Sequence, residues 1–169
     1  MKKISERIFY VGVNDDDKVL FEGLWPIPVG VSYNSYVVAD EKVALIDTVE
    51  SGFEEEFIAN IEEAIGDRQI DYLVVNHMEP DHSSLIAYMQ GRYPGLKIVA
   101  NAKTVPMLKG YYNVPQERIL VVAEGDEVRL FLSDETIEGF QSEKRRANTG
   151  ENRGSTGQGN ADKNSIEQS

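Results

Sequence analysis

Short apolar runs and apolar residues at helical spacing alternate along residues 1–132, and this pattern predicts an α/β (α+β) fold. Strands are predicted where the runs are rich in β-branched and aromatic residues, over 8–13, 33–39, 43–47, 72–76, 97–100, 119–123 and 128–132. Helices are predicted where apolar side chains recur every three or four positions, over 53–65, 85–91 and 104–112. Strand, helix, strand, helix, strand in the second half is the order typical of α/β proteins.

The segments between these elements predict turns and loops. Residues 14–17 read as a polar turn, residues 40–42 as the turn of a hairpin, and Gly66 as the end of the first helix. Residues 21–30 form a loop punctuated by Pro and Gly, and it carries Trp25, the only tryptophan. We expect Trp25 to pack against the protein, as large aromatic side chains commonly do, and a role in a pocket wall stays open.

Four potential metal ligands follow the strand predicted over 72–76, namely His77, Glu79, Asp81 and His82. In an extended chain alternate side chains leave on one side, so the first three should lie together. Pro80 keeps the residue before it out of helical conformation and holds the loop extended. The four could serve two ions, His77 with Glu79 and Asp81 with His82. Imidazole and carboxylate ligands without thiolate suit iron or manganese at least as well as zinc.

A simpler interpretation of this loop is a solvated turn in which Asp81 or Ser83 caps the following helix. Two features favour a metal site instead. Both histidines of the chain lie in this loop, and the loop follows the end of a buried strand, where open α/β sheets usually place their sites.

The pattern His77-x-Glu79-x-Asp81-His82 resembles the metal motif of the flavodiiron proteins, or A-type flavoproteins, a branch of the metallo-β-lactamase superfamily. Hydrolases of that superfamily carry histidine at the position of Glu79. Residues 20–36 resemble the N-terminal signature of the flavodiiron family, and the resemblance extends over roughly residues 4–130. It implies that residues 1–132 are the N-terminal part of a metallo-β-lactamase-like αββα sandwich.

The resemblance also implies an oxidoreductase that reduces dioxygen or nitric oxide at a di-iron site, with electrons passed through FMN from a flavin or rubredoxin-type donor. His77, Glu79, Asp81 and His82 would be the iron ligands. Asp47, at the end of a predicted strand, would support the metal loop by hydrogen bonding, and a helix or turn cap is an equally open role for it. A homo-oligomer is a further expectation.

The character of the chain changes after Leu132. Residues 133–169 hold few apolar side chains and predict a disordered tail. The resembled family would continue with further metal ligands and an FMN-binding domain, yet no histidine follows His82 and no flavin site is evident. We therefore expect a truncated or frame-shifted copy with an incomplete ligand set and no activity in isolation. The alternatives are a metallo-hydrolase using metal-bound hydroxide and a fragment without catalysis.

Composition argues against several classes of function for this chain. The formal net charge of −12 argues against binding to nucleic acid or to anionic membranes, because no basic field attracts phosphates. The absence of cysteine excludes disulfides, a thiolate nucleophile and iron–sulfur clusters ligated by this chain. No apolar run reaches the length of a membrane span, and we expect a cytoplasmic protein.

Overall fold

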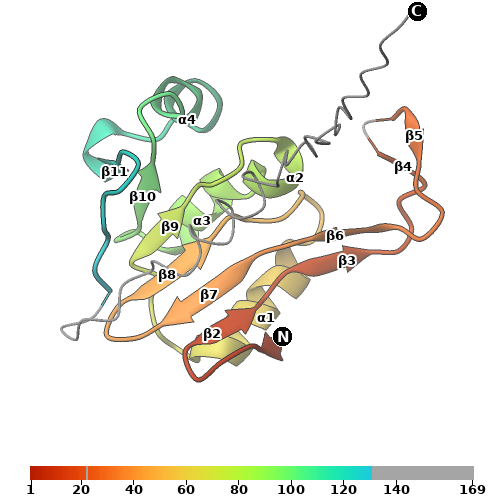
Figure 1. Ribbon diagram of the computed structural model, residues 1–169, viewed down its shortest axis with the longest axis horizontal. Helices are drawn as coiled ribbons and strands as arrows, with labels where there is room; N and C mark the ends of the chain where they lie inside the picture. The colour runs from red at the N-terminus through yellow and green to blue at the C-terminus, as the bar shows by residue number, and fades with distance from the viewer. Residues whose placement is uncertain (22, 131–169) are drawn as a thin grey trace, which may run out of the picture. The chain divides into compact units, whose positions relative to one another are not determined.

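A mixed seven-stranded sheet forms the centre of the computed structural model, which describes residues 1–21 and 23–130 (Figure 1). In sheet order its strands are β1 (Lys2–Lys3), β2 (Ile8–Tyr10), β7 (Tyr36–Ala39), β8 (Val43–Ile46), β9 (Tyr72–Val74), β10 (Lys97–Ala100) and β11 (Ile119–Val121). Neighbours from β1 to β8 pair antiparallel, and those from β8 to β11 pair parallel. The α/β class predicted from the sequence is therefore confirmed.

Four α-helices and one 3-10 turn occur among the described residues. They are α1 (Glu54–Ile65), α2 (Pro80–Ser83), α3 (Ile86–Arg92), α4 (Val105–Tyr112) and the 3-10 turn Gln116–Arg118. Helices α1 and α3 lie behind the sheet in Figure 1. The three predicted longer helices are confirmed to within one residue at every end, and Gly66 follows α1 with a positive φ of 62°. Within residues 1–21 and 23–130 no helix is both long and apolar enough to cross a membrane.

The core lies between the sheet and the helices. Alternate strand positions send side chains to this side of the sheet, and these include Val37, Leu45, Leu73 and Ile98, all fully buried. They form one cluster with Phe57 and Ile61 of α1 and Met89 of α3. Burial of these side chains fixes which face of each parallel strand is inward, and therefore the register of the strand ends that carry the candidate site.

The N-terminal strand predictions need correction. The predicted strand 8–13 is two strands, because the chain leaves the main sheet after β2 and enters β3 (Val13–Asp15). Strand β3 pairs with β6 (Val31–Tyr33), so the polar turn predicted over 14–17 is wrong for its first two residues. The predicted strand 33–39 is likewise divided between β6 and β7.

Two further predictions fail. The loop predicted over 21–30 contains part of a small hairpin, β4 (Leu20–Phe21) with β5 (Trp25–Pro26), and Trp25 is 65% exposed instead of packed. Residues 128–130 of the predicted last strand are not in a strand, although the Leu130 carbonyl accepts a hydrogen bond from the Lys42 amide at 3.0 Å. Residues 131 and 132, and the tail predicted over 133–169, lie outside the described residues.

The junction between β2 and β3 depends on Gly12. A Cβ added there would collide with the backbone carbonyl of Tyr33 and with the Tyr10 ring, whereas a Cβ on Gly110 of α4 meets nothing within 4 Å. We expect Gly12→Ala to lower the free energy of unfolding by about 1–3 kcal/mol through overpacking. Gly110→Ala should raise it by about 0.5–1 kcal/mol through helix propensity.

Urea unfolding of the two variants beside the parent measures both changes. Equal changes of the same sign in the two variants would contradict the packing described at Gly12.

Candidate metal centre

The four predicted ligands lie on the loop and short helix that follow β9. The Val75 amide still bonds to the Val99 carbonyl of β10 at 2.9 Å, and the chain leaves the sheet after it. Glu79 is extended, with φ −69° and ψ 150°, as Pro80 requires. Asp81, however, lies in the first turn of α2, so the prediction of an extended loop through Asp81 is wrong. Proline at the first helical position has the φ that a helix needs, and here it starts one.

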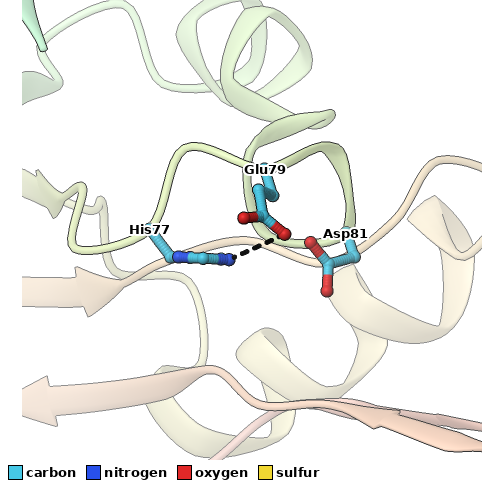
Figure 2. Close-up of side chains that lie close together, drawn as sticks. All are labelled: His77, Glu79 and Asp81. Carbon is cyan, nitrogen blue, oxygen red and sulfur yellow. Dashed lines mark ion pairs between the residues drawn. The ribbon is translucent and has the colours of Figure 1, made fainter. Parts of the chain in front are cut away.

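His77, Glu79 and Asp81 nevertheless converge (Figure 2). Each offers one ligand atom, and these three atoms lie within 4.8 Å of one another. His77 Nε2 is 3.4 Å from Glu79 Oε2, the pair joined by the dashed line in Figure 2. The structure thus brings three of the four predicted residues to one point, by a loop followed by a helical turn.

His82 stands beside this group. Its Nε2 lies 3.7 Å from Asp81 Oδ2, and its ring centroid lies 5.3 Å from that of His77 in an edge-to-face arrangement. Asp81 is therefore shared between the His77–Glu79 pair and His82. The grouping expected from the sequence, His77 with Glu79 for one ion and Asp81 with His82 for a second, stays a prediction, because Asp81 lies close to both histidines.

The donor set suits a metal ion. The side chains of Asp81 and His82 are 18% and 17% exposed, while those of His77 and Glu79 are 46% and 57% exposed, so the group has a sheltered side and an open one. Buried His82 Nδ1 has no hydrogen-bond partner among the described residues. Since buried polar atoms nearly always have a partner, this unpaired imidazole nitrogen is consistent with a ligand position, and the other ring nitrogen, Nε2, is the one that lies near Asp81.

Asp47 supports the start of the loop. It follows β8, is 7% exposed, and its Oδ1 accepts hydrogen bonds from the amides of Asn76 at 2.6 Å and His77 at 3.0 Å. Burial raises the pKa of this carboxyl, opposed by the two backbone hydrogen bonds and by the nearby histidines. The hydrogen-bonding role predicted for Asp47 is confirmed. Its φ of 55° is left-handed, a conformation that Asp and Asn adopt more readily than most residues.

Two hydroxyls also hold the loop: that of Thr48, for which no role was predicted, and that of Ser83, for which only capping was considered. The backbone amide and the Oγ1 of Thr48 both donate to the His82 carbonyl at 2.9 Å. Ser83 Oγ lies 3.0 Å from the carbonyls of Met78 and Glu79. No side chain caps α2 or α3, so the capping role considered for Asp81 and Ser83 is wrong. The only sequence signal for Thr48 is its position at the end of β8, next to Asp47.

Comparison with known proteins defines the class. The model of the family described as ODP family beta lactamase matches residues 31–142, and the chain belongs to this family. It is 35% identical over 124 residues to the anaerobic nitric oxide reductase flavorubredoxin of Aliivibrio fischeri, covering 73% of this chain and 25% of the relative. It is 37% identical over 111 residues to the flavo-diiron protein FprA2 of Clostridium acetobutylicum, covering 66% and 28%.

Solved structures agree. The rubredoxin oxygen:oxidoreductase of Desulfovibrio gigas matches with a TM-score of 0.71 and 29% identity, over 76% of this chain and 32% of that chain. The flavodiiron protein of Giardia intestinalis matches with a TM-score of 0.70 and 28% identity, over 76% and 31%. The predicted flavodiiron resemblance and metallo-β-lactamase-like fold are confirmed. The chain spans about a quarter of the length of the curated relatives that it matches.

Substitution of Asp47 tests the support of the loop. Asp47→Ala leaves two amides without their buried acceptor, and we expect it to lower the free energy of unfolding by about 1–3 kcal/mol. We also expect it to weaken Zn²⁺ or Co²⁺ binding by roughly 10–100-fold, as for other groups that orient ligands. Asp47→Asn keeps an acceptor oxygen and tolerates the left-handed backbone, so its effects should be smaller.

Urea unfolding and metal titration against a chelator measure these changes. Affinity equal to that of the parent in Asp47→Ala would contradict the supporting role.

Proposed function

We propose that this chain supplies the iron-binding part of an oxidoreductase that reduces dioxygen or nitric oxide. The observation that carries the proposal is the convergence of the His77, Glu79 and Asp81 ligand atoms within 4.8 Å, with His82 beside them. The names of the relatives support the substrate class, since one is called a nitric oxide reductase and another an oxygen:oxidoreductase. Because the chain spans only part of those proteins, their activity is a proposal here.

His77 and Glu79 would hold one iron, and Asp81 and His82 would hold a second. Carboxylate oxygens favour the ferric state and imidazoles stabilise the ferrous one, so the mixed set suits a metal that changes oxidation state. Iron, when bound, would supply the electrons that reduce the diatomic substrate. The open side of the group, where His77 and Glu79 are about half exposed, is where a small molecule would enter.

Electrons would reach this site through FMN and a rubredoxin-type donor. The supporting observation is indirect, because flavin and rubredoxin appear in the names of the relatives. Four points stay predictions from the sequence and its resemblance. They are the use of FMN, the rubredoxin-type electron donor, a homo-oligomer and a cytoplasmic location.

Anaerobic reconstitution with ferrous iron tests the proposal. After removal of excess metal we expect about two irons per chain, as in other paired-metal sites, and fewer than half as many in the His77→Ala/His82→Ala variant. Glu55→Ala, an exposed carboxylate on α1, is the control and should retain the iron of the parent. Reduced flavin is then added, and consumption of nitric oxide and of dioxygen is followed.

Iron retained equally by the parent and the double histidine variant would rule out this loop as the site. Because the chain is expected to be inactive in isolation, iron bound at the loop with no more consumption of either gas than reduced flavin alone gives would agree with a chain that supplies only the iron-binding part.

Glu79 allows a second test, of metal preference. Histidine at this position recreates the ligand pattern of the superfamily's hydrolases. Because imidazole replaces a hard carboxylate oxygen, we expect Glu79→His to raise the affinity for Zn²⁺ relative to Mn²⁺ and Fe²⁺. Competition titrations with the three metals measure the ratio, and Glu79→Gln serves as the control that removes charge without adding an imidazole. An unchanged ratio in Glu79→His would show that Glu79 is not a ligand.

A further inference from the structure

The hydroxyl of Tyr112, a residue outside the metal loop, contacts the buried Ser83 at the end of that loop. Tyr112 is the last residue of α4, and its hydroxyl lies 2.6 Å from the Oγ of Ser83. Ser83 is completely buried and lies in α2, between the candidate ligands and helix α3. This contact joins two residues that are 29 positions apart in the sequence.

The acceptors around Ser83 determine which hydroxyl donates in this contact. Ser83 Oγ lies 3.0 Å from the carbonyl oxygens of both Met78 and Glu79, and carbonyl oxygens only accept. The single hydroxyl hydrogen of Ser83 is therefore directed to these two carbonyls. The short contact to Tyr112 then requires the phenol to be the donor. The result is a chain of hydrogen bonds from Tyr112 through Ser83 to the Met78–Glu79 backbone.

Tyr112 is itself firmly placed. Asn113, the residue that follows α4, is left-handed with φ 51°. The Val114 amide donates to the carbonyl of Leu108, a fully buried residue, at 3.2 Å. The Tyr112 carbonyl also accepts a hydrogen bond from the Gln90 side chain of α3 at 3.4 Å. The backbone of Tyr112 is therefore fixed, and its phenol reaches Ser83 from a defined position.

We propose that Tyr112 is a positioning residue that sets the conformation of the metal loop through Ser83. The inference rests on the proposed metal site and adds a residue to it. The Asp47 carboxylate accepts hydrogen bonds from the amides of Asn76 and His77 on the β8 side. Ser83, which Tyr112 of α4 contacts, donates to the carbonyls of the two following residues. The backbone that carries His77 and Glu79 is therefore held from both directions.

Tyr112→Phe is the variant of choice, because it removes the hydroxyl and keeps the ring. Tyr111→Phe is the matched control, since Tyr111 is the neighbouring residue on the same helix and is 74% exposed. Amide hydrogen exchange is measured on the metal-free full chain. We expect exchange in residues 76–84 to be faster by roughly tenfold in Tyr112→Phe, as for loss of one buried hydrogen bond, and exchange in α1 to be unchanged.

A double-mutant cycle tests whether Tyr112 acts through Ser83. We expect Tyr112→Phe to weaken Co²⁺ binding by roughly tenfold, to alter the visible spectrum of bound Co²⁺, and to have no further effect in a Ser83→Ala background. Tyr111→Phe should match the parent in both measurements. Additive losses in the double variant would overturn the relay through Ser83.

The two measurements separate the two claims. A parent chain that binds no Co²⁺ would count against the proposed function, while exchange in the metal-free chain still decides the role of Tyr112. Unchanged exchange of residues 76–84 in Tyr112→Phe would overturn the inference, whatever the metal affinity.

Discussion

The candidate site depends on two hydrogen bonds to one buried carboxylate. Asp47, at the end of β8, accepts them from the amides of Asn76 and His77, where the loop after β9 begins. Burial raises the pKa of the Asp47 carboxyl, because the charged form loses its hydration in this position. The two amides lie at the point where the chain leaves the sheet. One buried side chain thereby fixes where the ligand loop begins.

The parallel sheet brings that carboxylate to the loop. Strands β8 and β9 are in register, with Ile46 opposite Val74, so the residues that follow them meet at one edge of the sheet. The amide of Asp47 donates to the Val74 carbonyl, which extends the pairing to the site itself. Packing of α1 and α3 against the inner face fixes this register. The geometry of the candidate ligands is thus a consequence of core burial.

Local sequence signals predicted the parts of this arrangement that depend on neighbours in the chain. The apolar run ending at Val75 and the polar residues after it placed the ligands at a strand end, and Pro80 fixed the conformation of Glu79. The same signal misled about Asp81, because proline both ends an extended stretch and begins a helix. The contact between Ser83 and Tyr112 had no local signal, since only the packing of α4 joins residues so far apart. The prediction that Trp25 packs against the protein was wrong for a related reason. Its exposure is set by the hairpin of β4 and β5, and this pairing could not be predicted.

The residues after β9 are proposed to bind metal where the three ligand atoms of His77, Glu79 and Asp81 meet. Anomalous X-ray diffraction at the iron edge, from crystals of the full chain loaded anaerobically with ferrous iron, tests it without relying on turnover. We expect an iron peak within bonding distance of His77, Glu79 or Asp81, with His82 at a second peak or beside the first. Iron located away from this loop, with these side chains arranged as in the metal-free chain, would contradict the account.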